Sequence, residues 1–116
     1  MPKAIQGTWY PNSSEGKKQC AAYRQKQNIN NRISALVITS ADAKSFAEYG
    51  EYTGYKLQKV SGLSKQSWKL STKLVIEGDE AKDMKIFDIW AKLERGQLYW
   101  SNRPTGDRES IYLRCL

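Results

Sequence analysis

The feature of this sequence that most constrains its fold is a regular alternation of apolar and polar side chains between Trp68 and Ile76. Successive side chains of a β-strand point to opposite faces, so a period of two indicates a strand with one buried face and one solvent face. The face expected to be buried carries Trp68, Leu70, Thr72, Leu74 and Ile76. Val75 is the single exception on the polar face.

Shorter segments of the same kind recur along the chain and are separated by turn-forming residues. Further strands are expected at residues 4–10, 33–39, 51–60, 84–93, 98–102 and 110–116, with breaks at 11–16, 61–65 and 104–109 and a tight hairpin turn at Arg95-Gly96. Residues 40–50 fit a strand or a helix ended by Gly50; a strand is favoured because the neighbouring segments are strands. Residues 17–27 fit a short helix capped by Ser13 or Ser14, or an ordered loop.

This pattern predicts an all-β protein with a single domain over residues 1–116. Seven or eight short strands joined by turns are typical of a small antiparallel barrel or a sandwich.

The two cysteines, Cys20 and Cys115, lie near opposite ends of the chain. Their pairing would close a loop of about 95 residues and stabilise the fold by roughly 4 to 5 kcal/mol. Disulfides persist in oxidising compartments, which predicts a periplasmic or secreted protein whose signal peptide has been removed, with Met1 as an added start. Two free buried thiols in a cytosolic protein are the alternative.

The net charge of +7 is concentrated near the N-terminus. Residues 1–32 hold six basic side chains against the single acid Glu15, a net charge of +5, and the remaining 84 residues carry thirteen basic and eleven acidic side chains. Such a segment attracts anionic partners. The candidate binding residues are Lys17, Lys18, Tyr23, Arg24, Lys26 and Arg32. An anionic cell-envelope component or a protein is the expected partner, nucleic acid is not expected for an exported protein, and a merely solvated loop stays open.

No catalytic chemistry is expected from the residues present. The chain has no histidine, so Ser-His and Cys-His nucleophile pairs are excluded. The acidic residues Glu77, Asp79, Glu80 and Asp83 fall in a turn, where solvated carboxylates are normal. We expect no metal site, because the sequence has no cluster of metal-ligating residues, and no cofactor, because it has no glycine-rich phosphate loop. We expect no membrane span, because the sequence has no long apolar stretch.

The opening Gly7-Thr8-Trp9 resembles the G-x-W motif of the calycins, the superfamily that contains lipocalins and avidins. The resemblance implies an up-and-down barrel in which Gly7 and Trp9 are structural and an arginine of the last strand packs across the indole. Arg114 is in the right region for that role, and Arg103 and Arg108 are rivals. The chain is also similar in size to small secreted inhibitors of bacterial metalloproteases, and its ending Tyr112-Leu113-Arg114-Cys115 resembles small exported proteobacterial proteins.

The large aromatic side chains divide between the expected core and a possible ligand cavity. Trp9, Trp68 and Phe87 are expected in the core, whereas Trp90, Tyr99 and Trp100 could line a cavity. A chain this short favours a barrel filled by its own side chains. The sequence therefore predicts a non-catalytic exported binding protein that uses loops at one barrel end. An inhibitor that plugs a secreted or host hydrolase, such as a protease or lysozyme, with its N-terminal segment or a loop is the alternative, and a carrier of a small apolar ligand comes third.

Overall fold

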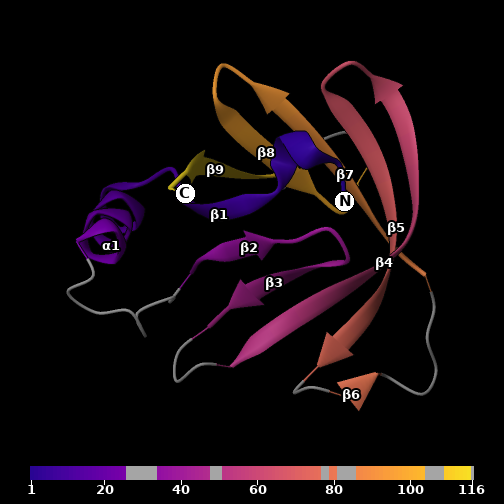
Figure 1. Cartoon of the computed structure of the whole chain (residues 1–116), viewed down its shortest axis with the longest axis horizontal. Coiled ribbons are helices and arrows are strands. Elements are labelled where there is room, and N and C mark those ends of the chain that lie inside the picture. Colours follow the sequence, from indigo (N-terminus) through magenta and orange to yellow (C-terminus); the bar gives the residue numbers. More distant parts are fainter. Residues whose placement is uncertain (26–33, 48–50, 77–78, 81–85, 104–108, 116) are drawn as a thin grey trace.

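The computed structural model contains a closed antiparallel β-barrel and one short α-helix (Figure 1). It describes residues 1–25, 34–47, 51–76, 79–80, 86–103 and 109–115. After a 3₁₀ turn at Lys3–Ile5 the elements are β1 (Gly7–Pro11), α1 (Ser14–Arg24), β2 (Leu36–Ile38), β3 (Asp42–Phe46), β4 (Tyr52–Ser64), β5 (Ser67–Ile76), β6 (Asp79–Glu80), β7 (Phe87–Glu94), β8 (Gln97–Ser101) and β9 (Ser110–Arg114).

Eight of the strands form the barrel, and each pairs with its neighbours in the order β1-β2-β3-β4-β5-β7-β8-β9, with β9 returning to β1. Every pairing is antiparallel, as an up-and-down barrel requires. The short strand β6 adds to the end of β5 beyond the point where β7 leaves it. The predicted all-β barrel with one short helix is confirmed.

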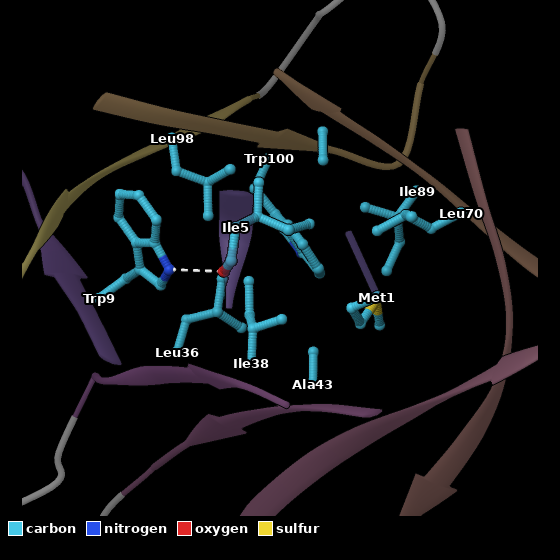
Figure 2. Close-up of a cluster of buried hydrophobic side chains, with 11 residues drawn as sticks. Met1, Ile5, Trp9, Leu36, Ile38, Ala43, Leu70, Ile89, Leu98 and Trp100 are labelled. Atoms are coloured by element: carbon cyan, nitrogen blue, oxygen red, sulfur yellow. Dashed lines mark hydrogen bonds between the residues drawn. The ribbon is translucent and has the colours of Figure 1, made fainter. Parts of the chain in front are cut away.

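The barrel interior is filled by apolar side chains from the N-terminal residues and the strands (Figure 2). Trp9 is fully buried, and its indole Nε1 donates a hydrogen bond of 2.9 Å to the carbonyl oxygen of Ile5. Met1 and Ile5 also lie in this cluster, together with Trp100 from β8. The N-terminal amine donates a hydrogen bond to the carbonyl oxygen of Ser40. The side chains of Met1 and Ile5 therefore pack inside the barrel, whereas Lys3 and Ala4 between them are exposed.

One barrel end carries the arrangement predicted for Trp9. The guanidinium carbon of Arg114 lies 4.3 Å from the centroid of the Trp9 ring. Its Nη1 and Nη2 donate hydrogen bonds to the carbonyl oxygens of Gln6 and Ala4. A guanidinium over an indole is a favourable cation–π contact. Among the three candidate arginines Arg114 therefore covers Trp9, while Arg103 lines a hollow on the outer barrel face and Arg108 lies outside the described residues.

Several predicted boundaries are wrong for identifiable reasons. The first strand starts at Gly7 because residues 3–5 form a 3₁₀ turn, and it includes Pro11, which was assigned to a break. Residues 61–64 of the break expected at 61–65 belong to β4, and the register shift between Gly62 and Ser64 marks an irregularity within the strand. The helix begins at Ser14, three residues earlier than expected, because Ser13 caps it.

The predicted buried face of β5 is correct except at its end. Leu70 and Thr72 are fully buried, whereas Ile76 is 52% exposed. At Ile76 the strand has passed the last residue paired with β7 and instead pairs with Thr53 and Asp79. Within residues 40–47 the chain forms the strand β3 at Asp42–Phe46, as favoured, and residues 48–50 lie outside the described residues.

Candidate functional site

A disulfide between Cys20 and Cys115 holds helix α1 against the barrel, with 95 residues of sequence separation and a Cα–Cα distance of 5.7 Å. The predicted pairing is thus confirmed. Around it a small second cluster forms from Tyr10, Ala35 and Cys115, with Tyr23 of α1 packed against them. The rings of Tyr10 and Tyr23 are 6.1 Å apart between centroids. Helix α1 is therefore fixed to the outer side of β1.

Helix α1 approaches β1 so closely that one position accepts only glycine. A Cβ placed on Gly16 would lie 2.0 Å from the carbonyl oxygen of Pro11, which is a backbone atom and has little freedom to move. The helix starts at this contact because the Ser13 hydroxyl accepts a hydrogen bond of 3.0 Å from the Gly16 amide, a normal N-cap. The sequence Ser13–Gly16 thus sets both the start of α1 and its docking distance.

A hollow of about 240 Å³, which we call the helix groove, lies between α1, the end of β1 and the end of β9. Its lining is mainly apolar and includes Cys20 of the disulfide, and it also carries the basic residues Lys17, Arg24 and Arg114. Lys17, Ala21 and Arg24 share one face of the helix because they are spaced by four and three residues. The full lining is Tyr10, Pro11, Gly16, Lys17, Cys20, Ala21, Arg24, Leu113 and Arg114.

The three basic side chains of the helix groove keep their positive charges uncompensated within the described part of the chain. No carboxylate lines the groove, and no ion pair to these three side chains is found among the described residues. Arg24 is oriented by a hydrogen bond of 3.2 Å from its Nε to the carbonyl oxygen of Cys115. Like charges around a partly apolar hollow raise the local concentration of anions. The geometry can hold a carboxylate, phosphate or sulfate group.

The structure brings only part of the predicted basic surface together. Lys17 and Arg24 line the helix groove, whereas Lys18 is exposed on α1 but is not among the lining residues. Tyr23 is half-buried against Tyr10 and is therefore not an open stacking platform. Lys26 and Arg32 lie outside the described residues.

The aromatic residues expected to share one cavity lie on opposite sides of the barrel wall. Trp100 is 9% exposed and packs in the interior, 6.2 Å from the ring of Tyr55. Trp90 and Tyr99 instead point outward, because Trp90 pairs with Ser101 and Lys92 pairs with Tyr99 on the alternate positions of β7 and β8. The alternative in which these three rings line a single cavity is therefore not realised, and the interior is filled by side chains, as the short chain favours.

Sequence reasoning missed that Arg114, assigned only to Trp9, also lines the helix groove. The sequence does contain a signal for this second role of Arg114. Arg114 precedes Cys115, and the disulfide to Cys20 brings Cys115 to α1.

Clusters of metal-ligating side chains and membrane-spanning helices were both sought among the described residues. These contain no group of three or more cysteine, aspartate and glutamate side chains that could hold a metal ion. In the same part of the chain, no helix combines the length and the apolar character needed to cross a membrane.

No family model, curated protein or solved structure matches the chain. The closed barrel with Arg114 over Trp9 is compatible with a calycin-like fold. Membership of that superfamily stays a prediction from the Gly7-Thr8-Trp9 motif.

Proposed function

We propose that the protein is a non-catalytic, exported binding protein that engages an anionic partner through the helix groove. The observation that carries this proposal is the placement of Lys17, Arg24 and Arg114 around one hollow whose lining, within the part of the chain that the structure describes, contains no carboxylate. Long basic side chains on a rim steer anionic partners by long-range attraction. The mainly apolar floor adds contact area for the partner's uncharged atoms.

The partner class that this arrangement fits is an acidic cell-envelope component or an acidic protein surface. Arginine presents several N–H donors in a planar fork, which suits carboxylate, phosphate and sulfate groups. Arg24 uses its Nε for Cys115 and Arg114 uses its two Nη atoms for Gln6 and Ala4, so both guanidinium groups are held in place before a partner arrives. Such preorganisation lowers the entropy cost of binding.

Other functions fit the arrangement less well. An apolar ligand inside the barrel would compete with the packed side chains of Trp9, Leu98 and Trp100. A hydrolase inhibitor that inserts its N-terminal segment would have to withdraw Met1 and Ile5 from the core, so an inhibitor would use α1 or a hairpin loop instead. The disulfide supports an oxidising compartment, periplasmic or secreted.

The test is calorimetric titration with two acidic probes, a heparin oligosaccharide and a poly-glutamate peptide, at low and high salt. The variant Lys17→Glu/Arg24→Glu replaces two of the three groove cations and leaves Arg114, which also covers Trp9, in place. The control Lys59→Glu/Lys73→Glu makes the same change in net charge on the outer face of β4 and β5.

We expect the groove variant to weaken binding of at least one probe by about tenfold or more, equivalent to about 1.4 kcal/mol, and the control to change it by less than about threefold. Binding should also weaken with salt. Equal losses in both variants would show that overall charge, not the groove, attracts the probes.

A further inference from the structure

A second hollow, of about 330 Å³, lies against the outer side of β7 and β8 next to the hairpin between β4 and β5. We call it the aromatic hollow. It differs from the helix groove in chemistry, because Trp90 and Tyr99 line it together with the exposed Leu63, and its charged lining residues are of both signs: Lys92, Arg103 and Glu109.

The two rings are held on neighbouring strands by the hairpin register. Trp90 lies opposite Ser101 and Tyr99 lies opposite Lys92, so the rings are diagonal neighbours on the outer face. Diagonal positions on paired strands are close enough for large aromatic side chains to form a continuous surface. Both strands belong to the closed barrel, so this surface is part of a rigid wall.

Lysine side chains orient both rings. The Nζ atom of Lys69 lies 5.5 Å from the Trp90 centroid, and that of Lys92 lies 4.8 Å from the Tyr99 centroid. The Tyr99 hydroxyl donates a hydrogen bond of 3.1 Å to Gln97. The ammonium groups therefore lie over the ring faces, and because the Lys69 and Lys92 side chains are 39% and 50% exposed they can move aside when a ligand packs on a ring.

The charges in and beside the aromatic hollow are balanced. Lys69 pairs with Asp88 at 3.8 Å and Lys92 pairs with Glu94 at 3.3 Å, and Arg103 and Glu109 add one charge of each sign. These carboxylates would repel a polyanion such as nucleic acid. A neutral ligand with many hydroxyl groups can instead donate hydrogen bonds to the carboxylates and accept them from the basic side chains.

We propose that the aromatic hollow binds an uncharged oligosaccharide. A pyranose ring has an apolar C–H face that can pack on Trp90 or Tyr99, whose ring faces carry partial negative charge. Its hydroxyl groups can accept hydrogen bonds from Lys92 and Arg103 and donate to Glu109. A hollow of 330 Å³ is at the small end of ligand sites and suits roughly one or two sugar rings.

The test uses tryptophan fluorescence and calorimetry with cellotetraose, chitotetraose and maltotetraose as probes and a single-stranded oligothymidylate as the competing ligand class. The variants are Trp90→Ala, which removes the platform, and Trp90→Phe, which keeps a smaller ring. The matched control is Tyr52→Ala, because Lys44 covers the Tyr52 ring at 5.1 Å on the outer surface of β3 and β4, away from the hollow.

We expect saturable, salt-insensitive binding of at least one tetrasaccharide, weakened about tenfold or more by Trp90→Ala, less by Trp90→Phe and not by Tyr52→Ala. Near-ultraviolet circular dichroism checks that each variant is folded; if Trp90→Ala is not, Trp90→Phe and Tyr99→Ala, which removes the second ring, decide. The proposal is overturned if no tetrasaccharide binds at millimolar concentration, if folded Trp90 and Tyr99 variants bind as the wild type does, or if only the oligothymidylate binds. The variant Lys17→Glu/Arg24→Glu should retain tetrasaccharide binding, so failure of the helix-groove proposal is distinguishable.

Discussion

Removal of the cross-link between α1 and β9 gives the largest stability change that we predict for a surface element of this protein. The double variant Cys20→Ala/Cys115→Ala deletes the bridge without leaving a free thiol. Cys115 is 4% exposed and packs with Tyr10 and Ala35, so alanine also loses some sulfur contacts there. The dominant effect, however, is on the unfolded chain, which becomes free over nearly its whole length.

The magnitude follows from the sequence separation of 95 residues. In the chain-entropy treatment a loop of this length contributes about 4.7 kcal/mol at 25 °C. The whole stability of a small domain is about 5 to 15 kcal/mol, so this loss is a large part of it. With an unfolding entropy of about 2.1 cal/mol/K per residue, or roughly 240 cal/mol/K for 116 residues, the melting temperature should fall by about 19 °C.

The assay is thermal unfolding followed by circular dichroism, for the wild type and the variant, each with and without a reductant. We expect the reductant to lower the melting temperature of the wild type to nearly that of the variant and to leave the variant unchanged. A fall of less than about 5 °C in the variant would refute the reasoning, because the unfolded chain would then be compact without the bridge.

Three further substitutions, and Gly62→Ala as a control for the first, test local features by unfolding. Gly16→Ala should destabilise α1 docking strongly because of the contact with Pro11, whereas Gly62→Ala, whose Cβ would meet no atom within 4 Å, should be nearly neutral. Arg114→Ala should cost about 1 to 2 kcal/mol through the lost cation–π contact and hydrogen bonds. Burial raises the pKa of Tyr112. The stability that this buried, protonated side chain contributes is therefore fully present below the unfolded-chain pKa near 10, and it is lost as pH rises through the folded-state pKa. Tyr112→Phe should flatten that alkaline decline in the unfolding free energy.

The barrel could be predicted from the sequence because its signals are local. The alternation in Trp68–Ile76 reports directly which side of a strand is buried, and Leu70 and Thr72 follow it. The turn at Arg95-Gly96 could also be recognised, and both residues have positive φ values, 53° and 76°. The disulfide could be predicted because the sequence contains only two cysteines, near opposite ends of the chain.

The features that could not be predicted depend on which distant segments meet. Gly62 is typical of a turn, but pairing with Trp68 extends β4 past it, because the ladder compensates for the weak local preference. The burial of Met1 inside the barrel has no local signal, since a terminal residue is ordinarily exposed. Trp90 and Trp100 lie on opposite faces of the barrel wall, and this could be determined only from the register between β7 and β8.

The two candidate sites depend on different parts of the structure. The helix groove exists only while α1 is docked, and Cys20, Tyr23 and Gly16 make the contacts that dock it. The aromatic hollow depends on strand pairing within the closed barrel, which the bridge does not cross. Reduction below the melting temperature of the reduced protein should therefore free α1 and weaken acidic-probe binding several-fold, while tetrasaccharide binding stays unchanged. An equal loss of binding of both probes, with near-ultraviolet dichroism retained, would show that α1 docking and the β7–β8 wall are coupled, although the contacts described for α1 are with β1 and Cys115.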